Sequence, residues 1–244
     1  INVADSPAPA SPTVFDPNLG TQGLPLPRTN VTRIGNESPY TFNNNGWITD
    51  GFDSTDGNAV ESGLELASPD GVDASSQAVG NPFRTYSSLW NPAPGIPGPG
   101  EAPTTDEARR GAVIQQFYIM NLYHDEMYRL GFTESARNFQ TNNFGRGGVG
   151  NDRISAEGQD SSGINNANFS SPADGARGRM QMYVFSGPLP DRDGSADAEI
   201  MIHEATHGLS NRLVGNSGGL SSNMSRSMGE GWSDFYAHCL LSES

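Results

Sequence analysis

The sequence predicts an α+β protein in which a β-rich N-terminal region precedes a set of helices. Short runs of β-branched and aromatic residues, interrupted by turn residues, occupy residues 31–104. Residues 105–130 instead show apolar positions at helical spacing, and two further helices are expected within 197–244. A chain of 244 residues is long enough to form one large domain or two small ones with a buried core.

Composition limits the classes of protein that this chain can belong to. Only 34% of residues are hydrophobic, and the 30 Gly and 17 Pro predict long loops around a modest core. The formal net charge of −14 argues against nucleic acid and anionic membranes as partners. No apolar run is long enough to span a membrane. A single cysteine, Cys239, excludes an internal disulfide.

The first 104 residues divide into two predicted regions. Residues 1–30 are rich in proline and are expected to form an extended N-terminal arm rather than a helix. The β-rich region that follows has four candidate strands, at 31–34, 40–42, 47–48 and 86–90.

A mixed region at 105–196 begins with the first clear helix. Thr104 or Thr105 is a suitable cap, and Gly131 is expected to end the helix near Leu130. Residues 153–156 and 180–185 are the candidate strands of this region.

The helices at 197–244 carry the residues that point to chemistry. A helix predicted from Asp197 to Leu213 contains the HExxH motif His203-Glu204-Ala205-Thr206-His207. Residues four apart share one face of a helix, so both imidazoles can bind one metal ion. Glu204 lies on the same turn, where it can act as the general base for a water molecule.

The third metal ligand separates the families that use this motif. In the metzincin pattern a third His comes six residues after the second, but Leu213 occupies that position here and Ser210 replaces the expected Gly. Glu230, on a third helix predicted from about 225 to 241, fits the alternative pattern. Asp234 lies four residues further on and can accept the remaining ring N–H of a ligand histidine.

Other residues of the helical segments receive a more ordinary interpretation. Gly229 and Gly231 flank Glu230 and are expected to let the third helix approach the second closely. His124 is expected to be a packed histidine with a hydrogen-bonding partner, beside Asp125. His238 is expected at the core or rim, and Cys239 as a small apolar group rather than a ligand.

Longer strings of residues resemble the fungalysin family of secreted zinc metallopeptidases, which are thermolysin-like gluzincins. The similarity is dense after residue 120, and it includes LYHD at 122–125, RNFQ at 137–140, NNANF at 165–169, HEATHGLSNR at 203–212 and GEGWSDF at 229–235. The resemblance implies a secreted, extracellular, zinc-dependent endopeptidase that hydrolyses peptide bonds in proteins and is made with a propeptide. It also implies a thermolysin-like fold.

The same resemblance implies roles for individual residues. His203, His207 and Glu230 would bind one Zn²⁺, and Glu204 would be catalytic. Asn166 and Ala167 are similar to the edge strand that binds substrate in thermolysin-like enzymes. The alternative for Asn166 is an ordinary turn residue in an Asn-rich loop.

The resemblance also predicts that residues 31–244 are an incomplete catalytic domain. Catalytic domains of this family continue into a helical C-terminal lobe, so we expect that the missing lobe or a second chain completes the cleft. Two alternatives remain open: a zinc-binding fragment that is catalytically incompetent, and a zinc hydrolase of a non-peptide substrate. Calcium is possible but unsupported at two acidic loops, 50–56 and 191–197.

Overall fold

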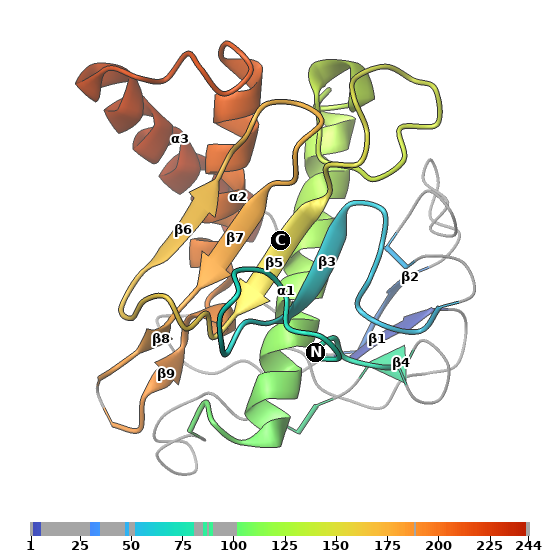
Figure 1. Cartoon of the computed structure of the whole chain (residues 1–244), viewed down its shortest axis with the longest axis vertical. Coiled ribbons are helices and arrows are strands. Elements are labelled where there is room, and N and C mark those ends of the chain that lie inside the picture. The colour runs from blue at the N-terminus through green and yellow to red at the C-terminus, as the bar shows by residue number, and fades with distance from the viewer. Residues whose placement is uncertain are drawn as a thin grey trace.

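The computed structural model describes residues 2–5, 30–34, 47–48, 52–80, 85–86, 88–89, 102–187 and 189–242. Within these ranges the chain combines helices with β-sheets, as the sequence predicts (Figure 1). The predicted strand at 40–42 and most of the predicted arm at 1–30 lie outside the described residues.

A four-stranded sheet forms the centre of the described structure. Its strand order is β3 (Val60–Leu64), β5 (Ile154–Gly158), β7 (Arg179–Met182) and β6 (Ala167–Ser170). The first three strands are parallel, and β6 is antiparallel to β7 at the edge of the sheet. The sequence predicts β5 and β7 but not β3, which contains a glycine and no aromatic residue.

The long helix α1 (Asp106–Arg129) runs across one face of this sheet (Figure 1). Its start matches the prediction, because the Thr105 side chain accepts a hydrogen bond from the Ala108 amide. The Ser62 hydroxyl of β3 donates to the Val113 carbonyl at 2.9 Å, which fixes the side of β3 that faces the helix. Alternate residues of the strands therefore face away from α1.

The smaller sheets refine the other strand predictions. β1 (Asn2–Asp5) pairs with β2 (Asn30–Ile34) and with β4 (Thr85–Tyr86). The last strand is shorter than the predicted 86–90, and residues 47–48 are buried in a bend rather than a strand. The predicted strand at 180–185 is interrupted at Tyr183, after which β8 (Val184–Phe185) pairs with β9 (Arg192–Asp193).

Two further helices, α2 (Ala198–Leu213) and α3 (Asn223–Ser242), pack against each other beside β6 and β7 (Figure 1). Short 3-10 turns, η2 (Glu134–Ala136) and η3 (Gly194–Ala196), lie after α1 and before α2. α3 begins before the predicted start near 225, because the Ser222 hydroxyl accepts a hydrogen bond from the Ser225 amide. Among the described helices, none combines the length and apolar character needed to cross a bilayer.

A buried arginine fixes the C-terminal end of α2. The Arg212 guanidinium donates to the Asp152 carboxylate at 2.8 Å and to the carbonyls of Pro172 and Ala176. It also stacks 4.0 Å above the centre of the Phe139 ring. Because both charged side chains are fully buried, this ion pair holds the HExxH helix against the segments that precede β5 and follow β6.

Candidate metal centre

The two motif histidines lie on one face of α2, as the four-residue spacing predicts. The helix begins at Asp197, whose carboxylate accepts hydrogen bonds from the amides of Glu199 and Ile200. Behind the motif, the Tyr123 hydroxyl of α1 lies 3.0 Å from the Thr206 hydroxyl. This buried contact helps to fix the rotation of α2, and His203 and His207 lie roughly a quarter of a turn around the helix from Thr206, where they are partly exposed.

The structure brings Glu230 of α3 to the two histidines. His203 Nε2 and His207 Nε2 lie 3.1 Å apart, and Glu230 Oε2 lies 3.2 Å from the first and 3.4 Å from the second. A tetrahedral zinc with bonds of about 2.0–2.1 Å has neighbouring ligand atoms roughly 3.3 Å apart. The three atoms therefore have the spacing and the chemistry of a zinc ligand set.

Asp234 occupies the position that the sequence predicts behind one of the histidines. Its Oδ1 lies 2.7 Å from His203 Nδ1, so the carboxylate can accept the proton of that nitrogen. This hydrogen bond favours the tautomer in which His203 Nε2 keeps a free lone pair, and that lone pair is turned toward Glu230.

The predicted role of the two glycines beside Glu230 is wrong. A Cβ atom at Gly229 would meet nothing closer than 3.8 Å, and one at Gly231 would meet nothing within 4 Å. Close approach occurs instead at Gly208, where a Cβ would lie 2.7 Å from the Phe169 ring of β6. Gly208, which sequence reasoning missed, thus sets the distance between the histidine helix and the edge strand.

Glu204 lies between the two histidines in sequence and is largely buried. Burial raises its pKa to about 7, with an opposing effect of His203 and a smaller rise from Glu230. Burial also lowers the pKa of His207, which favours the neutral imidazole needed for binding a metal. A carboxylate with a pKa near neutrality can both accept and release a proton.

A cleft of about 510 Å³ opens in front of these residues. Its wall includes His203, Glu204 and Glu230 on one side, and β6 with the residue that precedes it on the other. Ala167 is the buried first residue of β6, while Asn166 lies just before the strand with an exposed side chain. The structure thus brings both predicted substrate-binding residues to the cleft that contains the three candidate metal ligands.

Several residues that line the cleft were not identified from the sequence. Asn211 lies four residues after His207, and its side chain donates to the His207 carbonyl at 2.8 Å. The same helical spacing that identified the histidines could have found it. Leu220 and Arg226 also line the cleft, but no motif in the sequence distinguishes them.

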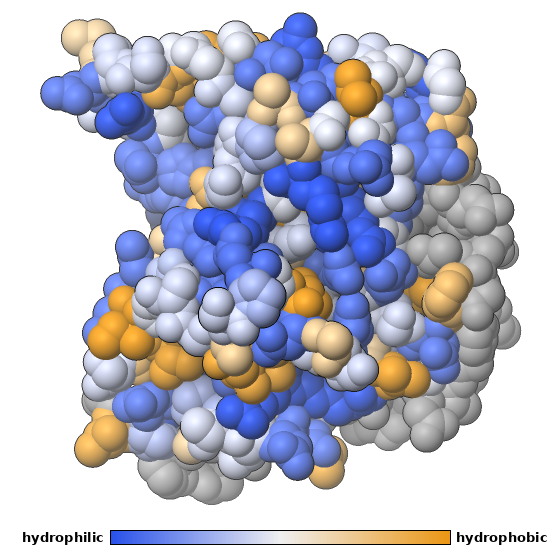
Figure 2. All heavy atoms as spheres, viewed as in Figure 1, coloured by the Kyte–Doolittle hydropathy of each residue, from blue (hydrophilic) through white to orange (hydrophobic). Residues whose placement is uncertain are grey.

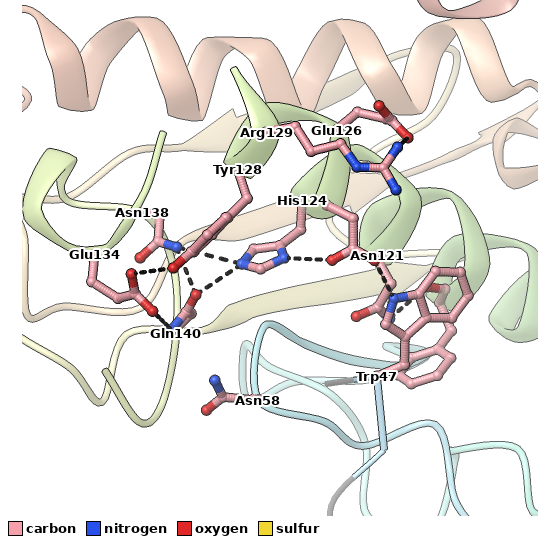
Figure 3. Close-up of polar contacts among 12 residues, drawn as sticks. Trp47, Asn58, Asn121, His124, Glu126, Tyr128, Arg129, Glu134, Asn138 and Gln140 are labelled. Carbon is pink, nitrogen blue, oxygen red and sulfur yellow. Dashed lines mark hydrogen bonds and ion pairs between the residues drawn. The ribbon is translucent and has the colours of Figure 1, made fainter. Parts of the chain in front are cut away.

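His124 lies outside the cleft, in a polar network at the end of α1 (Figure 3). Its Nδ1 lies 3.1 Å from Asp125 Oδ1, and its Nε2 lies 3.0 Å from Gln140 Oε1. The network continues from Asp125 to the Trp47 indole and from Gln140 to Glu134. The prediction of a packed histidine with hydrogen-bonding partners is confirmed.

The remaining candidates on α3 do not reach the ligand set. His238 is exposed, and its Nε2 lies 3.5 Å from a Glu199 carboxylate oxygen. It is therefore not part of the core. Cys239 is half-buried, and the chain has no second cysteine with which it could form a disulfide.

An α+β fold with an HExxH helix facing a glutamate of the next helix is typical of the gluzincin class of metallopeptidases. Comparison of the sequence with protein families agrees, because residues 24–244 match the model of the fungalysin metallopeptidase (M36) family. The chain belongs to this family.

Curated relatives are fungal extracellular metalloproteinases. The chain is 44% identical over 197 residues to extracellular metalloproteinase MEP of Pyricularia oryzae, which covers 79% of this chain and 30% of the relative. It is 42% identical over 244 residues to extracellular metalloproteinase 2 of Trichophyton rubrum, covering 97% of this chain and 36% of the relative. With extracellular metalloproteinase 4 of Arthroderma otae, the identity is 58% over 132 residues, 53% of this chain and 20% of the relative. The chain thus spans about a third or less of these relatives.

Proposed function

We propose that this chain forms the metal-binding part of a secreted, zinc-dependent endopeptidase that hydrolyses peptide bonds in extracellular proteins. The observation that carries this proposal is the placement of His203 Nε2, His207 Nε2 and Glu230 Oε2 within 3.4 Å of one another at a cleft. Family membership and the names of the relatives support the same activity and an extracellular location.

His203, His207 and Glu230 would hold the zinc ion. Two imidazole nitrogens and one carboxylate oxygen are a ligand set that catalytic zinc uses, leaving a fourth position for water. Zinc bound there supplies a Lewis acid that lowers the pKa of water and polarises a carbonyl group. Asp234 would keep His203 in the tautomer that leaves Nε2 free for the metal.

Glu204 is proposed as the general base. Its carboxylate lines the cleft, and its pKa of about 7 allows it to take a proton from the attacking water near neutral pH. The same carboxyl group would then give this proton to the amine that leaves. Glu204 would not bind the zinc.

The substrate would lie along β6, the outermost strand of the four-stranded sheet. An extended peptide can add to such an edge through backbone hydrogen bonds. Asn166 would contribute its exposed side chain, and Ala167 its backbone, beside the metal ligands. In this arrangement, backbone hydrogen bonds would hold a protein or peptide substrate, so binding would depend only weakly on the side chains of the substrate.

We further propose that residues 31–244 contribute to one thermolysin-like catalytic unit, with residues 1–30 as an extended arm. The fit of three parts supports this unit: the sheet, α1 behind it, and the pair of helices that carry the ligands. A propeptide and further chain that completes the cleft belong to the proposal through family membership.

The test is zinc-dependent cleavage of casein by the purified chain. Cleavage should disappear with a chelator and return with zinc, and Glu204→Gln should retain zinc while losing about 10²–10⁴-fold in turnover. Glu199→Gln is the matched control, because it changes an exposed glutamate on the first turn of the same helix and should retain activity.

Other outcomes would select different functions. Full activity in Glu204→Gln would remove this residue as the base, and cleavage that survives zinc removal would exclude a zinc peptidase. Bound zinc without cleavage would favour a zinc-binding, catalytically incompetent fragment. The side chain of Glu230 is 62% accessible to solvent. This exposure favours the catalytically incompetent zinc-binding fragment as the second candidate function, because an open site excludes water poorly.

A further inference from the structure

A second group of acidic side chains lies at the C-terminal ends of two parallel strands, away from the histidines. Glu157 is on β5, Glu65 directly follows β3, and Asp160 lies two residues beyond β5. Strand register places Glu157 beside Gly63, on the face of the sheet opposite α1. We call these three residues the sheet-end cluster.

A loop formed by residues 66–77 closes over the sheet-end cluster. A Cβ atom at Gly63 would lie 2.3 Å from the Val72 side chain and 2.5 Å from the Ser76 hydroxyl, so the loop packs directly on the strand. Hydrophilic residues predominate over this face of the sheet (Figure 2). The cluster nonetheless lies beneath that surface, since Glu65, Glu157 and Asp160 are each at most 3% exposed.

Each member of the cluster has at least one buried carboxylate oxygen without a hydrogen-bonding partner. Among the described residues, neither oxygen of Glu157 has such a partner, and the same holds for Oε2 of Glu65 and Oδ2 of Asp160. A buried carboxylate that lacks hydrogen bonds and a counter-charge is costly. Four buried carboxylate oxygens of the cluster are therefore left without a protein donor, and a cation bound among them would satisfy them.

Protein cations compensate this charge poorly. Arg179 Nε lies 3.9 Å from Glu157 Oε2, while the other end of the guanidinium pairs with Asp70. Burial is the main cause that raises the pKa of Glu157 to about 8. The negative charge of Asp70 also raises this pKa, and the positive charge of Arg179 opposes the rise. When its three carboxyl groups are ionised, the cluster therefore carries more negative charge than Arg179 offsets.

We propose that the sheet-end cluster is a calcium site that stabilises the fold and is separate from the zinc site. One ligand atom from each of Glu65, Glu157 and Asp160 lies within 4.8 Å of the others. Oxygens bound to one Ca²⁺ at about 2.3–2.6 Å are separated by no more than roughly that distance. The donor set contains only oxygen, which calcium prefers and zinc in such sites does not.

The two acidic loops considered from the sequence are less suitable. In the described part of 50–56, Asp56 pairs with Arg153 at 2.6 Å. In the second loop, Asp193 accepts hydrogen bonds from Gln159 and Ser195, and Asp197 caps α2. Protein donors already satisfy these carboxylates, whereas each member of the sheet-end cluster keeps at least one buried oxygen without a donor.

The experiment measures calcium in the zinc-loaded chain after treatment with a calcium chelator and reloading of zinc. At about 1 mM Ca²⁺, elemental analysis should find one calcium per chain. The melting temperature should rise by roughly 5–10 °C once calcium is well above its Kd, and Mg²⁺ should have a much smaller effect. These readouts do not depend on peptidase activity, so the result is independent of the proposed function.

Glu157→Gln should abolish both the bound calcium and the rise in melting temperature. Without calcium, its melting temperature should equal or exceed that of the wild type, because one uncompensated buried charge is removed. The matched control, Glu126→Gln, changes a glutamate that pairs with Arg129 on α1 and should respond to calcium like the wild type.

Three results would overturn the proposal. These are the absence of bound calcium at this concentration, as expected if the carboxylates share a proton instead; an equal response to Mg²⁺; and an unchanged calcium response in Glu157→Gln. If Glu157→Gln does not fold, Glu65→Gln provides the same readout at a second carboxylate of the cluster.

Discussion

The proposed zinc ligands His203, His207 and Glu230 come together on helices, whereas the sheet-end cluster comes together through strand register. Two of the helical ligands belong to one motif, and the third lies on the next helix. In the sheet, Glu65 and Glu157 are far apart in the sequence and become neighbours because β3 pairs with β5. Helical ligands are therefore visible as a local pattern, and sheet ligands are not.

The two groups also differ in their exposure to solvent. The side chains of Glu230 and Asp234 are 62% and 67% accessible, whereas that of Glu157 is 1% accessible. An open metal site exchanges water and leaves a position for substrate, although it excludes bulk water poorly. A closed site of oxygen ligands is suited to holding an ion permanently, so its loss should affect stability rather than chemistry.

One buried ion pair connects the two regions and gives the largest expected effect. Arg212 ends the histidine helix, and Asp152 lies two residues before β5, the strand of Glu157. Arg212→Met should lower the free energy of unfolding by about 3–5 kcal/mol, because Asp152 is left buried without a counter-charge. Urea denaturation measures this loss.

The double variant Arg212→Met with Asp152→Asn tests the reason for that loss. It should recover part of the stability, since the uncompensated charge is gone. A single variant that loses less than about 1 kcal/mol would show that the two regions do not depend on this connection.

The next largest effect should concern only the site on the helices and leave the sheet-end cluster unchanged. Asp234→Asn places an amide beside His203 Nδ1, and the amide N–H can favour the tautomer that protonates Nε2. Zinc affinity should fall about 10–100-fold. Competition with a zinc-binding dye measures the affinity, while the melting temperature without zinc should stay the same.

Glu199→Gln serves again as the control, because it leaves the ligand set unchanged. An Asp234→Asn variant that binds zinc as tightly as this control would mean that the hydrogen bond to His203 does not tune the site.

The contrast between helix and sheet explains what the sequence could predict. Thr105, Gly131 and Asp197 mark the ends of helices through local features: Thr105 was one of two predicted caps, and Gly131 and Asp197 were predicted as the end of one helix and the start of the next. β3 was missed because Glu61 and Gly63 interrupt its apolar pattern, although α1 and the loop at 66–77 bury much of the strand. Burial by distant segments leaves little trace in the residues of the strand itself.

The same limit applies to the sites. The motif spacing was sufficient to predict His203, His207, Glu230 and Asp234 together, and the structure brings all four into contact. No spacing could predict the sheet-end cluster, because the register between β3 and β5 is a tertiary property.

The smallest expected effect concerns Glu61 of β3, which is compared with Glu65, the residue directly after that strand. Glu61 faces the same side of β3 as Glu65 but is paired with Arg153 and Arg177. Burial raises the pKa of Glu61, but the hydrogen bond from Arg177 and the charge of Arg153 outweigh it, so the net pKa is lowered. For Glu65, burial is the main cause of a raised pKa, and the interaction with Asp160 raises this pKa further.

A lowered pKa means that the ionised Glu61 stabilises the folded state above its unfolded pKa, which is near 4.5, the ordinary value for a glutamate. That contribution should be lost as the pH falls through the lower pKa of the folded state. Urea titrations of the metal-free chain between about pH 3 and pH 7 measure it, with Glu61→Gln as the comparison. The wild type should lose more stability than the variant on acidification, by on the order of 1 kcal/mol or less because the pair is partly exposed. Parallel curves would mean that Arg153 and Arg177 do not stabilise the Glu61 carboxylate, and the contrast between paired and unpaired carboxylates on this face of the sheet would then fail.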